Sequence, residues 1–137
     1  MTATLLIDAA QDAATRAYAP YSKFHVGAAI QLSDGQIVTG ANFENASYGL
    51  SLCAETVALA KVANDGRLGD VVEIAVIGGV GPEPVRPCGR CRQMLNEAAQ
   101  IGARDIVVYC SSGDRSTIER HMLSALLPHA FGPKDLI

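Results

Sequence analysis

Apolar positions along the chain recur with two different spacings, and these spacings predict the elements of the fold. Over 3–18 they follow helical spacing, which ends before Pro20. Two β-rich runs, 24–32 and 36–43, flank a turn at 33–35 whose Asp-Gly pair is typical of a hairpin. The first third of the chain is therefore expected to form a helix and then an antiparallel hairpin.

Helical segments alternate with short apolar strands in the rest of the chain. The predicted helices are 53–64, 88–102 and 117–128, and the predicted strands are 73–80 and 105–110. Both strands are nearly all apolar, which is typical of strands buried on both faces of a sheet. This order predicts a sheet covered by helices, in which the later strand–helix–strand steps are parallel.

Composition and charge narrow the classes of function. The chain has 137 residues, 49% hydrophobic and 18% charged, which is enough apolar material for one domain with a core. Its net charge of −3 disfavours binding to nucleic acid, which is held mainly by Lys and Arg. No apolar run approaches the roughly 20 residues of a membrane span, and the N-terminus lacks a basic leader region. We expect a single cytoplasmic domain over 1–137 that binds neither nucleic acid nor membrane.

Three of the four cysteines stand at spacings typical of metal ligands. Cys88 and Cys91 form a Pro-Cys-x-x-Cys motif, and Cys53 begins Cys-Ala-Glu. Both segments lie at predicted helix starts, where free backbone N–H groups and the helix dipole favour a thiolate. Cysteines of a reducing compartment are better candidates for metal binding or catalysis than for disulfides. Three thiolates would leave a fourth position open, as in catalytic zinc sites.

These motifs also admit other interpretations. Pro-Cys-x-x-Cys alone fits a redox dithiol or a structural zinc knuckle as well. Cys110 could be the fourth ligand of a closed structural site, but it ends an apolar strand and is expected in the core. Glu55 could be an exposed residue that favours the helix dipole, or a carboxylate that moves protons beside a metal-bound water.

Taken together, the Cys-Ala-Glu and Pro-Cys-x-x-Cys motifs match the zinc deaminase signature. The chain resembles the small, homotetrameric, three-cysteine cytidine deaminases over almost its whole length. The matching blocks, in order, are 18–29, 40–49, 53–55, 87–93 and 126–131. The resemblance implies an α/β fold, a three-layer α/β/α sandwich with a mixed five-stranded sheet. It also implies hydrolytic deamination of cytidine and 2′-deoxycytidine to uridine and 2′-deoxyuridine, with release of ammonia, in pyrimidine salvage.

The same resemblance implies roles for individual residues. Cys53, Cys88 and Cys91 would bind one Zn²⁺ per subunit, and Glu55 would shuttle protons between zinc-activated water and the substrate. The implied contacts to the nucleoside substrate are Phe24, Asn42, Glu44, Ala46, Tyr48, Ala54 and Phe131. Within a homotetramer, Phe131 and the 46–48 segment would complete the site of a neighbouring subunit.

Four of the implied substrate contacts have a simpler alternative. Phe24 could be a core residue at the start of a strand. Asn42 and Glu44 alternate, so they could share one face of a strand or mark its solvated end. Phe131 could dock the C-terminal tail.

One position departs from the family pattern. Many three-cysteine members carry Arg directly after Cys-Ala-Glu, whereas this chain has Thr56. Three thiolates and Zn²⁺ leave a net negative charge, which that Arg would offset, and a threonine carries no charge. The candidates for compensation here are the two helix N-termini, Arg90 and Arg92.

Three rival functions share part of the pattern. Blasticidin S deaminase has the same cysteine motifs but lacks the Asn-x-Glu pair, so Asn42 and Glu44 favour a free nucleoside. Polynucleotide deaminases usually have His in place of the first Cys and a basic surface, unlike this chain. A catalytically silent zinc-binding or nucleoside-binding protein would be expected to have lost Glu55 or a ligand, and none is lost here.

Overall fold

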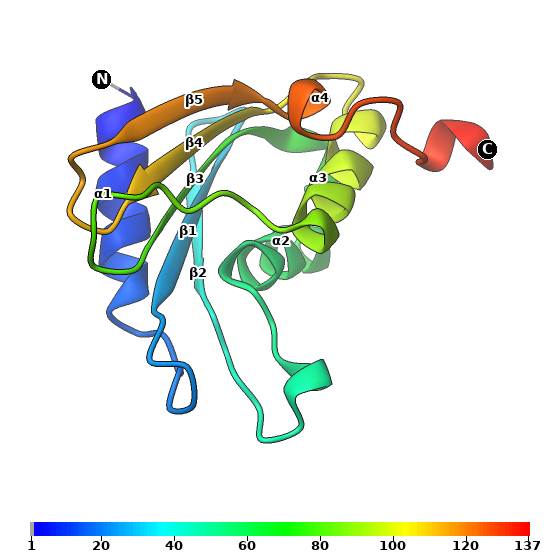
Figure 1. The fold of residues 1–137 in the computed structure, drawn as a ribbon. Coiled ribbons are helices and arrows are strands. Elements are labelled where there is room, and N and C mark those ends of the chain that lie inside the picture. The colour runs from blue at the N-terminus through cyan, green and yellow to red at the C-terminus, as the bar shows by residue number, and fades with distance from the viewer. Residues whose placement is uncertain (1) are drawn as a thin grey trace.

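A mixed sheet in the order β2-β1-β3-β4-β5 forms the middle layer of the structure, a computed structural model that describes residues 2–137 (Figure 1). The strands are β1 (Val26–Leu32), β2 (Ile37–Ala41), β3 (Val71–Gly78), β4 (Val107–Ser112) and β5 (Ile118–Met122). Strands β1 and β2 form the predicted antiparallel hairpin, whose turn contains Gly35 at φ +90°. Strand β3 pairs antiparallel with β1 and parallel with β4, as the strand–helix–strand pattern predicts.

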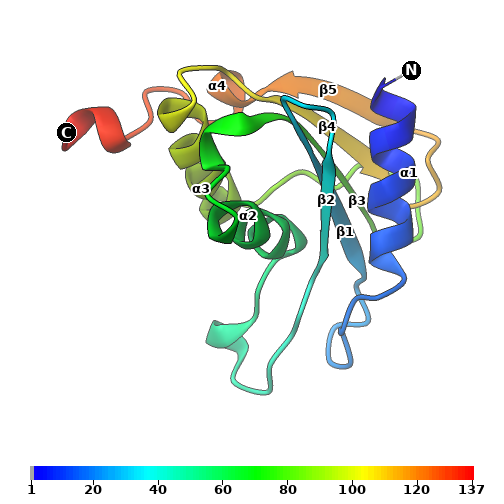
Figure 2. The ribbon, with the colours of Figure 1, turned by 180° about the vertical axis from the view of Figure 1, so that it is seen from behind.

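Helices cover both faces of this sheet. They are α1 (Thr2–Ala14), α2 (Ala54–Asn64), α3 (Gly89–Ile101) and the short α4 (Leu123–Leu126). Helix α1 lies on one face, whereas α2 and α3 lie on the other, as Figures 1 and 2 show from opposite sides. Each face has its own apolar core, with Leu6, Ile7 and Ile77 between α1 and the sheet, and Ile74, Leu95 and Val108 between the sheet and helices α2 and α3. The three-layer α/β/α sandwich is confirmed.

The prediction of a helix over 117–128 is wrong for the first half of that segment. Residues Ile118–Met122 form strand β5, which pairs antiparallel with β4, and only Leu123–Leu126 are helical. The outer edge of β4 carries free backbone N–H and C=O groups, and a returning strand satisfies them. This pairing with β4 outweighs the helical spacing of the apolar residues in the segment.

The first helix also ends earlier than expected, at Ala14 instead of residue 18. The backbone N–H of Tyr18 donates to the carbonyl of Asn42 at 2.9 Å, and the carbonyl of Tyr18 accepts from the N–H of Glu44 at 2.9 Å. These bonds hold Tyr18 beside the 42–44 segment, and residues 15 and 16 form a turn that leads from α1 to it. Strands β3 and β4 are displaced by two residues from the expected 73–80 and 105–110. Among residues 2–137, no helix has both the length and the apolar character needed to cross a membrane.

Helix α2 lies directly against β2 at Gly40. A Cβ atom on Gly40 would lie 2.5 Å from the backbone N of Ala58 and 2.7 Å from the carbonyl oxygen of Ala54. Gly40→Ala is therefore expected to lower the free energy of unfolding by about 1–3 kcal/mol, the usual cost of overpacking. Urea denaturation measures this change, with Gly81→Ala as the control because a Cβ there meets no atom within 4 Å. Equal stability of the two variants would contradict the close packing of α2 on β2.

Candidate active site

The starts of α2 and α3 bring three cysteines together. Cys53 is the N-cap of α2, Cys88 is the N-cap of α3, and Cys91 lies in the first turn of α3. The three sulfur atoms lie within 4.8 Å of one another, and the Sγ atoms of Cys53 and Cys88 are 3.8 Å apart. The two helix N-termini therefore point the three thiols at one place.

The spacing of these sulfurs fits a tetrahedral metal ion. Zn–S bonds of about 2.3 Å at tetrahedral angles separate two sulfurs by roughly 3.8 Å, whereas a disulfide needs about 2.05 Å. Hydrogen bonds from the thiols of Cys91 and Cys88 lower the pKa of Cys53 to about 6, so the cluster readily holds a thiolate. Three soft sulfur ligands suit zinc. Cys91 is buried, while Cys53 and Cys88 also line a cavity, so the fourth position would face that cavity.

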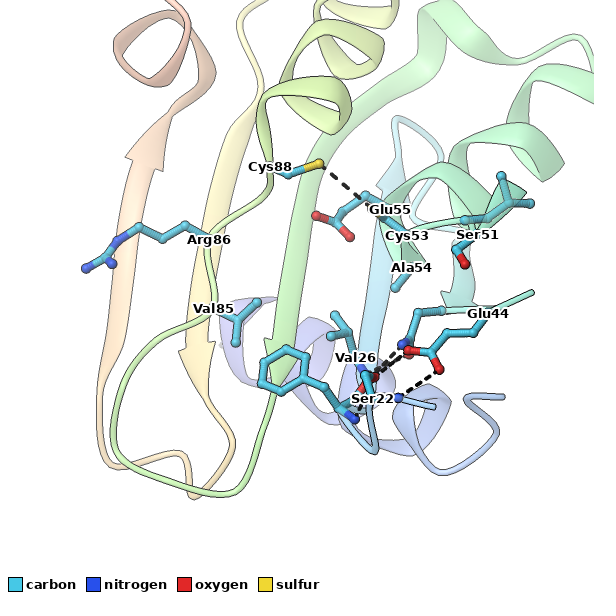
Figure 3. A pocket seen from close by; sticks show the side chains of 13 residues that line it. Ser22, Val26, Glu44, Ser51, Cys53, Ala54, Glu55, Val85, Arg86 and Cys88 are labelled. Atoms are coloured by element: carbon cyan, nitrogen blue, oxygen red, sulfur yellow. Dashed lines mark hydrogen bonds between the residues drawn. The ribbon is translucent and has the colours of Figure 1, made fainter. Parts of the chain in front are cut away.

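The cavity has a volume of about 370 Å³ and two chemically different ends. At one end lie Cys53, Glu55 and Cys88, and at the other lie Ser22, Phe24, Asn42 and Glu44, which are joined by hydrogen bonds. Figure 3 shows Glu55 beside Cys88 and Cys53, with Ser22 and Glu44 gathered at the opposite end. A cavity of this size holds a small molecule that bridges a metal end and a hydrogen-bonding end.

Glu55 lies in the first turn of α2, two residues after Cys53, and its side chain is only 5% exposed. Burial raises the pKa of its carboxyl to about 7, and the nearby Cys53 thiolate adds to the shift. The interpretation of Glu55 as an exposed residue of the first helical turn is therefore wrong. A buried carboxyl with this pKa exchanges protons readily near neutral pH.

At the other end, Asn42 and Glu44 follow the last residue of β2, and both side chains are half-buried. Phe24 is 46% exposed and lines the cavity. The alternative that Phe24 is a core residue at the start of a strand is therefore wrong. Ala54, buried under the cavity wall, lies between the two ends. Four of the seven substrate contacts implied by the resemblance are thus gathered around one cavity.

The other three contacts lie outside that cavity. Tyr48 is 74% exposed and packs on Tyr21, with ring centroids 5.9 Å apart, and Ala46 is exposed on the same loop. Phe131 lies beside α3, where its carbonyl accepts hydrogen bonds from Gln93 at 2.7 Å and Asn96 at 3.1 Å. Its ring is 60% exposed. The backbone of the tail is thus docked while the ring of Phe131 faces outward.

Six residues that line the cavity were not predicted from the sequence: Ser22, Val26, Ser51, Leu52, Val85 and Arg86. The only indication in the sequence that Ser22 belongs to the cavity was its place inside the matching block 18–29. Arg86 forms a two-point ion pair with Glu119 of β5 at 2.7 and 2.9 Å, and it points away from Glu55 in Figure 3. Because Glu119 was expected on a helix, no pattern along the chain indicated this pair.

The charge around the cysteines is offset by different means than an arginine at position 56. The hydroxyl of Thr56 is buried and lies 3.5 Å from the Sγ of Cys91. The positive charge of Arg90 favours the thiolate of Cys53. Arg92 donates instead to the carbonyls of Pro87 and Leu126, at 2.7 and 3.0 Å.

Cys110 lies apart from the cluster. It is fully buried in the core beneath α3, as expected, and burial raises the pKa of its thiol to about 11. A thiol in such surroundings stays neutral and packs as a small apolar side chain.

Known proteins are similar to this chain in both sequence and fold. Residues 2–110 match the family model for the cytidine and deoxycytidylate deaminase zinc-binding region. A cytidine deaminase of Halalkalibacterium halodurans is 46% identical over 138 residues, covering 99% of this chain and 98% of that protein. One of Mycobacterium tuberculosis is 42% identical, covering 93% and 87%. The crystal structure of cytidine deaminase from Burkholderia pseudomallei superposes with a TM-score of 0.85 at 42% identity, covering 96% of this chain and 100% of that one.

Proposed function

Because the chain belongs to the cytidine and deoxycytidylate deaminase family, we propose that it deaminates both cytidine and 2′-deoxycytidine by hydrolysis, yielding the uridine nucleosides and ammonia. The family membership and the cysteine cluster support a zinc-dependent enzyme. The observation that carries the proposal is the placement of three cysteine sulfurs and a buried glutamate at one end of a cavity. Such a reaction belongs to pyrimidine salvage, in which free nucleosides are reused.

In this proposal Cys53, Cys88 and Cys91 hold one Zn²⁺ per chain. When bound, zinc supplies a Lewis acid that makes water easy to deprotonate near neutral pH. The thiolates themselves need a reducing compartment, so we place this enzyme, one catalytic domain over 1–137, in the cytoplasm.

Glu55 is the proton shuttle. Its carboxylate takes a proton from water and delivers it to N3 of the pyrimidine, while the oxygen adds to C4. It then moves the remaining hydroxyl proton to the amino group, which leaves as ammonia when the C4–N bond breaks. The support for this role is that Glu55 is buried, lines the cavity and follows a cysteine ligand by two residues.

The other end of the cavity binds the nucleoside. The ring of Phe24 packs on the pyrimidine, Asn42 and Glu44 bind hydroxyl groups of the sugar, and Ala54 forms the wall between them. The 3′-hydroxyl is present in ribose and in deoxyribose, so this set of contacts serves both substrates. Polar groups within a mostly apolar cavity orient a ligand of this kind.

A substrate panel tests this assignment. The zinc-loaded chain is expected to convert cytidine and 2′-deoxycytidine at similar rates and to leave blasticidin S and cytosine in oligonucleotides unchanged. Product formation is followed by chromatography. Faster turnover of blasticidin S than of cytidine would show that Asn42 and Glu44 do not select a free nucleoside.

We also propose that the working unit is a homotetramer of 14.3-kDa chains in which sites are shared. Phe131, Ala46 and Tyr48 are exposed and lie outside their own chain's cavity, which supports contacts to a neighbouring subunit. The mass of four chains, about 57 kDa, is measurable by sedimentation equilibrium.

Subunit mixing tests the shared site. Phe131→Ala should raise KM for cytidine about two- to tenfold, since an aromatic contact is lost. Refolding this variant with excess Glu55→Gln chains should restore its KM, because an intact Phe131 then comes from the neighbour. An unchanged KM after mixing, with heteromers verified by mass, would contradict a shared site.

A further inference from the structure

A bent segment, residues 21–26, carries Phe24 along the sugar-binding end of the cavity. Ser22, Phe24 and Val26 all line that cavity. Lys23 adopts a left-handed conformation with φ +59°, and its N–H donates to the carbonyl of Ala19 at 3.0 Å. The segment is solvent-exposed up to Phe24 and has no strand partner before Val26. Besides the bond from Lys23 and one from the N–H of Gly79 to the carbonyl of His25 at 3.2 Å, side-chain hydrogen bonds hold it in place.

The carboxylate of Glu44 holds the first half of this segment. One oxygen accepts from the N–H of Tyr21 at 3.1 Å and from the N–H of Ser22 at 3.2 Å, and the other accepts from the Ser22 hydroxyl. The bond from the Ser22 hydroxyl is the main cause that lowers the pKa of Glu44. A carboxylate offers about four acceptor positions, so the three bonds leave about one for a substrate hydroxyl.

The hydroxyl of Ser22 has a second partner. Its oxygen accepts a hydrogen bond from the N–H of Phe24 at 3.0 Å. The carbonyl of Phe24 accepts from the side-chain amide of Asn42 at 2.8 Å, and Asn42 also accepts from the N–H of Val26 at 2.9 Å. Both backbone polar groups of Phe24 are therefore bonded, directly or through Ser22, to the two residues proposed to bind the sugar.

We propose that Ser22 is a positioning residue that joins the sugar-binding carboxylate of Glu44 to the backbone of Phe24. This inference rests on the proposed function of Glu44 and Phe24. Through one hydroxyl, Ser22 orients the carboxylate toward the sugar and fixes the residue whose ring covers the base. Sugar recognition and base packing then depend on each other, and neither depends on the zinc.

The test is Ser22→Ala in the zinc-loaded enzyme. Loss of a hydrogen bond to a charged group should raise KM for cytidine by about tenfold or more, with kcat changed by less than about threefold. Ser22→Thr keeps the hydroxyl and should restore KM to near the wild-type value. Zinc content and thermal midpoint should stay at wild-type values in both variants.

A matched control and a double mutant make the test specific. Ser116→Ala removes a hydroxyl that donates to a carboxylate, Asp114, at 2.7 Å outside the cavity, and it should leave KM unchanged. In a Glu44→Gln background, Ser22→Ala should raise KM by much less than in the wild type. A wild-type KM in Ser22→Ala, failed rescue by Thr, or full additivity with Glu44→Gln would overturn the proposal.

Failure of this inference is distinguishable from failure of the proposed function. If the wild-type chain did not deaminate cytidine, the function would be wrong, and Ser22 would then be tested by calorimetric binding of uridine. Uridine has the same sugar and a similar ring, so Ser22→Ala should weaken its binding by about tenfold. Equal affinity in wild type and Ser22→Ala would overturn the role of Ser22 on its own.

Discussion

Glu55→Gln is expected to lower kcat for cytidine by about a thousandfold or more. Loss of a positioned acid–base group usually costs about a hundredfold to ten-thousandfold in rate. Glutamine has the same size and keeps a hydrogen-bonding end, but it cannot take up and release the proton. The side chain is buried at the metal end of the cavity, so bulk water has little access to replace it. Steady-state kinetics measure the loss, and metal analysis is expected to find the same zinc content as in the wild type.

The matched control for this variant is Glu97→Gln. Glu97 is an exposed residue of α3 that lies outside the cavity, and its substitution should leave kcat unchanged. A kcat for Glu55→Gln within tenfold of the wild type would mean that another group moves the proton. A loss of zinc in Glu55→Gln would show instead that the variant disturbs the cysteine cluster.

Cys88→Ala is expected to remove the zinc and with it all activity. Two sulfurs, Cys53 and Cys91, would remain, and a site with two ligands binds zinc far more weakly than one with three. Metal binding and folding are linked, so the thermal midpoint should also fall by several degrees. Elemental analysis of the dialysed protein and a thermal melt measure the two effects.

Cys110→Ala provides the comparison for that result. It also removes a thiol, from the core instead of the cluster, so it should cost some stability and keep the full zinc content. If Cys88→Ala kept its zinc, or if Cys110→Ala lost it, the assignment of the ligands would be wrong.

Local patterns were sufficient for most of the fold. The hairpin was predictable because Asp-Gly marks its turn, and the parallel β3–β4 pair was predictable because α3 lies between two apolar strands. Strand β5 was not predictable, since its formation depends on the free edge of β4, which no spacing within 117–128 reveals. The end of α1 at Ala14 likewise depends on pairing of Tyr18 with a distant segment.

The residues of the site also divide into those that local patterns predict and those that depend on distant contacts. Cys53, Cys88, Cys91 and Glu55 could be identified because short motifs at helix starts carry them. The bonds of Ser22 to Glu44 could not be predicted, because the two residues lie 22 positions apart in the sequence. Motifs record side chains that act from one local element, whereas the contacts that position them come from the packing of several elements.

The most direct test of the whole account is the reaction itself. The purified zinc-loaded chain is incubated with cytidine, and uridine and ammonia are quantified together. The account predicts that the two products form in equal amounts, that a chelator which removes the zinc stops the reaction, and that added zinc restores it. A folded chain with its zinc in place that forms neither product would contradict the account.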